Sequence, residues 1–317
     1  MKLSHGSNLF TIAIASIAIG FSSWHCCAET FTHITAEEGA IDYDFAKDPA
    51  NGTYTEPGSD YHFKLTFKQG QRSTPQPVLV ATIRTTTAEH FRGKSALQMQ
   101  IVDRDEVDTV KAAYKVSIDS EGPRDKFSPL VKEPKDWYHG FAMKIDADYF
   151  KLPEQGELLF EQWWQSSPFH PPVSMVIVGP KDATAHGWND AGPNGHFALL
   201  LRDDEHNALN NLPGQPQYYD LGPAIVGRWM RWVVHVRPSA AVAEGAIDVS
   251  LDGREKLNLA HVKVGYDPEH PQYADHKPSI HLAGVNVCLY RMNGQNNQRF
   301  YFDEIKFADR FEDAEPK

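Results

Sequence analysis

The segment Ile280–Arg291, IHLAGVNVCLYR, decides how this chain folds. Successive side chains of an extended strand point to opposite faces, so Val285, Val287 and Leu289 share one face that suits the core of a β-sandwich. The other face is small and polar and ends in an aromatic ring; it carries Gly284, Asn286, Cys288 and Tyr290. Such a face suits the floor of a ligand groove. A lone tyrosine there is more often simple packing, so the rest of the chain must decide its role.

The first 28 residues have the organisation of a secretory signal peptide. Lys2 and His5 precede the apolar run Leu9–Phe21, and the small residue Ala28 follows it. The apolar run is too short to span a bilayer. We expect cleavage after Ala28 and a secreted or periplasmic protein with no membrane span.

Cysteine usage then excludes an internal disulfide. Cys26 and Cys27 would leave with the signal, and Cys288 would remain as a small buried filler. An exported protein without disulfides needs a large hydrophobic core. Residues 29–317 are numerous enough to form one, and no Pro/Ser-rich linker divides them, so we expect a single domain and a monomer.

Charge and composition narrow the ligand class. The formal net charge is -11, which excludes the basic surface of a nucleic-acid-binding protein. It also disfavours a densely sulfated ligand. The chain contains 7 Trp, 12 Tyr and 17 Phe together with 21 Pro and 22 Gly, which is typical of a strand-and-loop protein whose aromatic rings can stack on sugars.

Short runs with strand character recur along the whole chain, and turn residues separate many of them. This pattern predicts an all-β antiparallel sandwich rather than alternating β–α units. The clearest run is Ala246–Leu251, which Asp252-Gly253 ends with a hairpin turn. The other predicted strands are 61–67, 78–85, 96–102, 113–119, 137–145, 157–164, 173–178, 197–202, 231–236, 284–290 and 299–307.

Two long polar segments, Gly179–His196 and Asp203–Gly222, carry aromatic rings and histidines. Long loops inside a compact domain are often functional, so we expect both to wall a groove. Trp188 is a candidate substrate contact in the first loop, and His186 and His196 are candidate proton-transfer residues.

Several motifs occur in an order that resembles polysaccharide lyases of the heparinase-I and glucuronan-lyase type. They are WYHGF, FEQWWQ, GRWMRWVVHV, VSLDG, GVNVCLYR and YFDEIKF, spread over Ser95–Phe307. The resemblance implies a secreted β-jelly roll of two antiparallel sheets, related to concanavalin A, with a saccharide groove on its concave face. It also implies cleavage of a uronic-acid-containing polysaccharide by β-elimination.

The resemblance also assigns roles to individual residues. It places the family's catalytic tyrosine at Tyr290, and amides that neutralise the uronate carboxylate at Gln162 and Asn286. Trp164 occupies the position of the family's proton-transfer histidine and becomes a candidate sugar contact. One loop histidine, among His170, His186, His196 and His281, could replace the missing one.

Further candidate substrate contacts are basic. Lys111 and Lys115 lie where the family has an Arg-x-Glu-Leu-like strand, although Ala113 stands in place of its glutamate, and Arg291 follows the tyrosine. No cofactor is required by these motifs. Asp303 and Glu304 could hold Ca²⁺, but no calcium-binding loop motif is present, so a metal stays unassigned.

The lost histidine keeps a second function open, a non-catalytic carbohydrate-binding jelly roll. A third reading, glycoside hydrolysis, requires two carboxylates at a fixed separation. No Glu-x-Asp-x-x-Glu strand occurs in the sequence, so hydrolysis is disfavoured.

Overall fold

The computed structural model describes residues 30–34, 41–44, 52–55, 62–69, 79–103, 114–121, 129–150, 152, 154–190, 192–206, 208–209, 214–282, 284–291 and 297–317. The predicted signal peptide and Lys111 lie outside these residues. No helix in the described part is long and apolar enough to cross a membrane.

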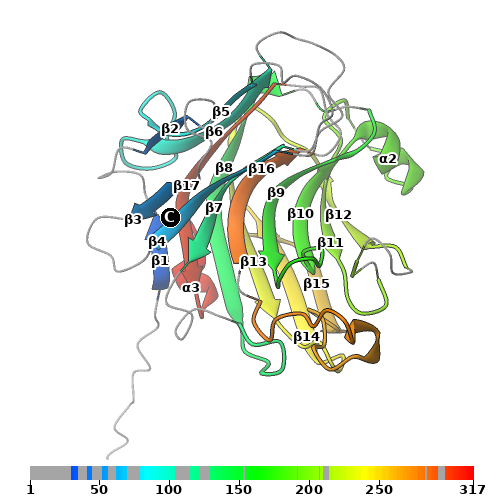
Figure 1. The fold of residues 1–317 in the computed structure, drawn as a ribbon. Coiled ribbons are helices and arrows are strands. Elements are labelled where there is room, and N and C mark those ends of the chain that lie inside the picture. The colour runs from blue at the N-terminus through cyan, green and yellow to red at the C-terminus, as the bar shows by residue number, and fades with distance from the viewer. Residues whose placement is uncertain are drawn as a thin grey trace, which may run out of the picture.

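The described strands form two antiparallel sheets, which confirms the all-β sandwich (Figure 1). The nine-stranded sheet runs in the order β15 (Arg254–Val262), β14 (Gly245–Leu251), β13 (Trp229–Arg237), β8 (Trp137–Phe150), β17 (Gln298–Ala308), β6 (Ala96–Asp103), β5 (Leu79–Thr86) and β2 (Asp42–Asp44), with β1 (Thr30–Ile34) paired to β17. The eight-stranded sheet runs in the order β12 (Gln217–Pro223), β11 (His196–Leu201), β10 (Val173–Val178), β9 (Glu157–Trp164), β16 (Gly284–Arg291), β7 (Tyr114–Glu121), β4 (His62–Gln69) and β3 (Gly52–Thr55).

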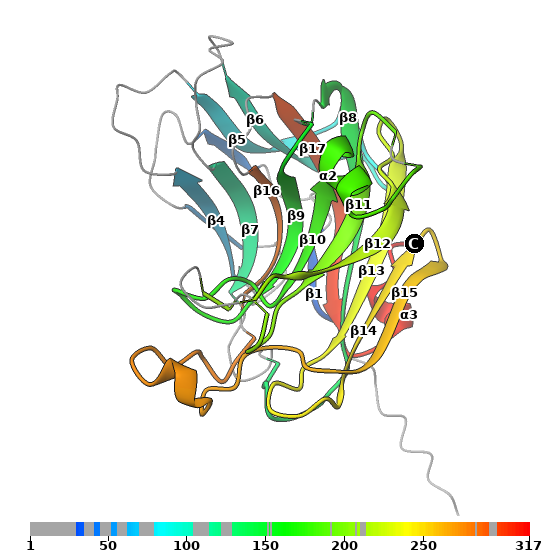
Figure 2. The same cartoon turned by 90° about the vertical axis from the view of Figure 1, so that its right-hand side faces the viewer.

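The core fills the space between the two sheets, which Figure 2 shows side by side. The alternation predicted for β16 is confirmed, because Val285, Val287 and Leu289 are at most 3% exposed in this core. Aromatic rings join the sheets across it: Trp232 of β13 packs against Phe197 of β11 with ring centroids 5.1 Å apart. Burying each such side chain stabilises the fold by roughly 1.5–3 kcal/mol.

The hairpin predicted at Asp252-Gly253 joins β14 to β15. Both residues have positive φ values, 53° and 73°, as a tight two-residue turn requires. Strand β15 itself was not predicted, because its sequence REKLNLAHV is mostly exposed and begins with three charged residues. β15 is an edge strand of the nine-stranded sheet, and none of its side chains is fully buried.

Both predicted loops contain regular structure. The short helix α2 (Pro180–Ala185) begins at a proline within the first, and β12 (Gln217–Pro223) closes the second. In both views α2 lies at the upper end of the eight-stranded sheet, and the segment around the 3₁₀ helix η1 (Pro271–Tyr273) lies at its lower end (Figures 1 and 2). The remaining helix, α3 (Phe311–Ala314), packs on β17 and β8.

Candidate functional site

The candidate residues meet on the face of the eight-stranded sheet that is turned away from the core, here called the outer face. Asn286 of β16 lies directly opposite Gln162 of β9, and Gln162 lies opposite Ser174 of β10. The three side chains are 3%, 5% and 0% exposed. Because β9 and β16 are neighbours, the two predicted amides form one polar row across the strands.

Tyr290 lies four residues after Asn286 on β16, so its side chain points to the same face. It is the cross-strand partner of Lys115 on β7 and, after a β-bulge, of Leu159 on β9. Its ring is half-buried and packs on an apolar patch of the outer face that includes Cys288. Burial raises the pKa of Tyr290, and the nearby Cys288 thiol raises it further. The phenol is therefore protonated at neutral pH in the absence of substrate.

Lys115 is the charged neighbour of this tyrosine. Its side chain is 5% exposed, which is unusual for a lysine on a β-sheet face. Cβ atoms of directly opposed residues in an antiparallel pair lie about 5 Å apart, so the two side chains leave the sheet as neighbours on the outer face. The backbone of Arg291 completes β16 opposite Leu158, and its side chain lies outside the described part of the structure.

The two adjacent tryptophans of β9 point to opposite faces, as alternation predicts. Trp163 is fully buried in the core. Trp164 stays partly exposed on the outer face, opposite Gly284, and its indole nitrogen donates to the carbonyl of Phe169 at 3.0 Å. This hydrogen bond connects Trp164 to the loop that follows β9.

The first predicted loop places a set of rings on the outer face near α2. His186 stacks on Trp188 with centroids 5.0 Å apart and packs against Tyr218 of β12 at 4.5 Å. The Tyr218 hydroxyl donates to Glu157 of β9. Neither Tyr218 nor Glu157 was predicted as a site residue, because the polar segment that forms β12 was interpreted as a loop.

His196 lies at the start of β11 and is fully buried. Its Nδ1 is 2.8 Å from Asp220 and its Nε2 is 3.1 Å from Asp190. Gly195 makes this turn possible, since its φ is +74° and a Cβ there would lie 2.0 Å from the Val178 carbonyl oxygen. Strand β11 is three strands from β16, about 14 Å at normal sheet spacing, so His196 and Tyr290 serve different parts of the face.

One cluster among the described residues could hold a cation. Asp190, His196 and Asp220 bring a ligand atom each within 4.8 Å of one another. Asp303, for which the sequence left a metal unassigned, accepts hydrogen bonds from the backbone amides of Phe91 and Arg92, both at 3.1 Å. Its carboxylate therefore fastens a loop to β17.

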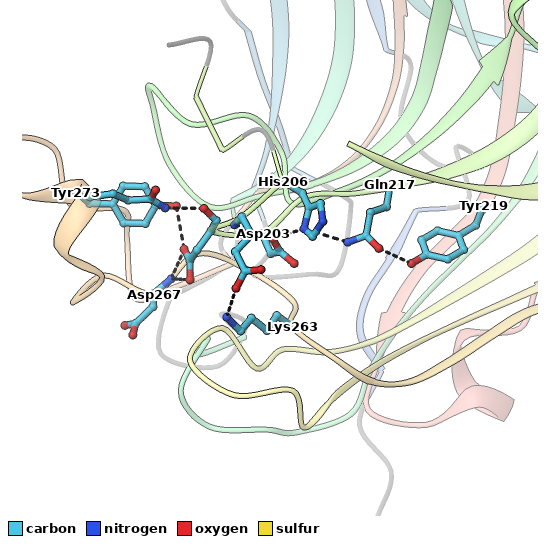
Figure 3. A network of polar contacts seen from close by, with 10 residues as sticks. Asp203, His206, Gln217, Tyr219, Lys263, Asp267 and Tyr273 are labelled. Atoms are coloured by element: carbon cyan, nitrogen blue, oxygen red, sulfur yellow. Dashed lines mark hydrogen bonds and ion pairs between the residues drawn. The ribbon is translucent and has the colours of Figure 1, made fainter. Parts of the chain in front are cut away.

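The lower end of the outer face is bounded by a polar network between the β11–β12 and β15–β16 connections (Figure 3). Tyr273 donates to Asp204 at 2.8 Å, and His206 contacts Asp203 at 2.6 Å. His170 belongs to this region, where its carbonyl accepts from Tyr266. The other loop histidine, His281, forms an isolated bridge with Leu130.

Comparisons with known proteins identify one family and several proteins of similar structure. The family model "Polysaccharide lyase" matches residues 64–306. Endo-beta-1,4-glucuronan lyase from the fungus Trichoderma reesei is similar in structure, with 17% sequence identity, a TM-score of 0.55, and coverage of 84% of this chain and 98% of that chain. Alginate lyase Aly36B gives 9% identity and a TM-score of 0.40 over 87% of this chain and 95% of its own. No curated protein sequence matches.

Proposed function

This chain belongs to the polysaccharide lyase family, and we propose that it cleaves a uronic-acid-containing polysaccharide by β-elimination with Tyr290 as the proton-transfer residue. The observation that carries this proposal is the position of Tyr290. It stands half-buried on the outer face, on the same strand as Asn286 and next to the strand of Gln162.

β-Elimination moves one proton and breaks one C–O bond. A base removes the proton from C5 of the uronate, the C4–O4 bond breaks, and a C4=C5 double bond forms in the new terminal sugar. The negative charge that develops spreads onto the uronate carboxylate, and O4 leaves with a proton. The site must therefore supply a base, an acid and groups that stabilise a carboxylate carrying extra charge.

The polar row formed by Gln162 and Asn286 suits the stabilisation of the uronate carboxylate. The side-chain amides of Gln162 and Asn286 can donate to the two carboxylate oxygens from neighbouring strands. Within the described part of the chain, the Gln162 amide makes no hydrogen bond, so it is open to a ligand. Preorganised donors of this kind typically contribute 10²–10³-fold to the rate each.

Lys115 supplies the positive charge that the tyrosine needs. A buried phenol with a raised pKa is a good acid for the leaving O4 but a poor base until it ionises. An ammonium opposite the phenol favours the phenolate and also attracts the uronate. Tyr290 can then take the C5 proton and return one to O4, which requires no histidine on β9.

The second part of the proposal is export. Met1–Ala28 acts as a cleaved signal, which suits an enzyme that acts on an extracellular polymer. Expression of the full chain in a bacterial host, followed by mass spectrometry of the exported protein, tests this. A mature N-terminus at Glu29 supports export, whereas an intact chain retained in the cytosol contradicts it.

The proposed reaction is tested by incubating the protein with glucuronan, alginate and heparin and following the ultraviolet absorbance of unsaturated uronide ends. Glucuronan or alginate is expected to yield such ends, and densely sulfated heparin is expected to yield fewer because the chain carries a net charge of -11. Glycan binding without any product would instead indicate a non-catalytic carbohydrate-binding protein.

A further inference from the structure

The outer face differs in character on the two sides of Tyr290. On the β7 side, its cross-strand neighbour is the buried cation Lys115. On the β10–β12 side lie the three rings His186, Trp188 and Tyr218, here called the aromatic platform. When a long polysaccharide places one uronate at Tyr290, its neighbouring sugars lie over different surfaces. One side offers Lys115 and the other offers the aromatic platform.

The aromatic platform and Tyr290 share one apolar surface. Trp188, Tyr218 and Tyr290 all pack against the same patch, made of Leu159, Val176, Val178, Ala183, Ala198, Leu200 and Cys288. His186 is exposed, and Trp188 is partly exposed. The rings are therefore reachable from the side on which Tyr290 stands, and a sugar chain can contact both without crossing an edge of the sheet.

Acidic side chains lie at the aromatic platform and directly behind it. Tyr218 donates to Glu157, and Trp188 stacks at 5.5 Å on His196, whose ring nitrogens face Asp220 and Asp190. Burial and the Glu157 charge both raise the pKa of Tyr218, so the hydroxyl remains a donor rather than a second anion.

One described cation, Arg202, acts electrostatically on Tyr218. Its guanidinium donates to the carbonyl of Pro171 at 3.2 Å. A second uronate placed on the aromatic platform would face the carboxylates of Glu157, Asp190 and Asp220 against this one described cation, which is unfavourable.

A neutral sugar meets none of this repulsion. Its C–H faces can stack on the indole and phenol rings, and its hydroxyls can donate to the Glu157 carboxylate. Resting on the proposed β-elimination at Tyr290, we propose that the aromatic platform is a subsite for an uncharged sugar. The substrate is then a heteropolysaccharide in which neutral sugars accompany the uronate, rather than a pure polyuronate.

The test compares an alternating polymer of uronate and neutral sugar, hyaluronan, with the pure polyuronates glucuronan and alginate. The wild-type protein is expected to show at least tenfold higher kcat/KM on the alternating polymer. Trp188→Ala should raise KM for that polymer about tenfold. Glu157→Gln, which keeps an acceptor for Tyr218, should raise kcat/KM on glucuronan several-fold, whereas the matched control Glu255→Gln on exposed β15 should leave both rates unchanged.

The Tyr290→Phe variant allows binding to be compared without turnover. Its affinities for hyaluronan, glucuronan and alginate are measured by affinity electrophoresis. Tighter binding of hyaluronan that Trp188→Ala abolishes supports the neutral-sugar subsite even if no polymer is cleaved, in which case only the proposed elimination fails. Equal or tighter binding of glucuronan, unchanged by Trp188→Ala and Glu157→Gln, overturns the subsite while leaving elimination intact.

Discussion

Asn286 and Gln162 lie directly opposite each other on β16 and β9, with both side chains on the outer face and at most 5% exposed. Segments that are about 120 residues apart in the chain thus contribute one polar row next to Tyr290. A β-sheet of this register fixes the separation of the amides without any loop, so their geometry is rigid before substrate binds.

Removing either amide is expected to lower activity strongly. Gln162→Ala and Asn286→Ala should each reduce kcat/KM about 100-fold, because each removes one donor to the charge that develops on the uronate carboxylate. Steady-state rates from the absorbance of unsaturated ends measure this. Ser166→Ala, at the start of the loop beyond β9, is a control on the same segment and should stay near the wild-type rate. Near-normal rates in both amide variants would exclude the assigned roles.

Lys115 is expected to matter through its charge. Lys115→Met should lower kcat/KM at least 100-fold at neutral pH, while Lys115→Arg should keep a larger share of the activity because the positive charge remains. Circular dichroism checks that both variants fold. Equal losses in the two variants would show that the lysine is needed for packing rather than for its charge.

The pH profile follows from the raised pKa of Tyr290. As a base the phenol must lose its proton, so kcat/KM should rise with pH through the neutral and alkaline range, by about tenfold per unit while the phenolate is scarce. A maximum below pH 7 would point to a histidine or carboxylate instead. His186→Gln tests the loop histidine of the aromatic platform: an unchanged profile is expected, and loss of one limb would assign His186 the proton transfer.

The fold could be predicted because β16 and its neighbours obey simple alternation. Val285, Val287 and Leu289 are in the core and Asn286 and Tyr290 are not, as the period-two pattern requires. The same rule correctly separated Trp163 from Trp164. Cross-strand register is a property of the assembled sheet, so the direct pairing of Tyr290 with Lys115 was not visible in the sequence.

A β-bulge explains why strict alternation fails to predict the burial of some residues of β9. A bulge in β9 lets Phe160 and Glu161 both enter the interior, where Glu161 accepts from His139 at 2.8 Å and from Trp163 at 2.9 Å. Strict alternation would have exposed one of them. The aromatic platform was predicted only in part, because Tyr218 belongs to a strand, β12, whose polar sequence was read as a loop.

Asp303 gives a prediction about stability. Burial raises its pKa to about 6, so the folded state holds this proton to higher pH than the unfolded state does. The contribution is most stabilising below pH 4 and is lost as pH rises toward about 6, by about 3 kcal/mol. The difference in unfolding free energy between wild type and Asp303→Asn, from urea titrations at pH 4 to 7, should change over this window. A constant difference would contradict the assignment.

The most direct test is Tyr290→Phe, which removes only the phenol oxygen. Product formation is measured on the polysaccharide that the wild-type protein cleaves best, and binding of the same polymer is measured by affinity electrophoresis. Proton transfer by Tyr290 predicts that unsaturated ends disappear, with a loss of at least 10³-fold in kcat, while affinity changes less than about threefold. A variant that keeps cleaving at a rate near that of wild type would contradict the mechanism.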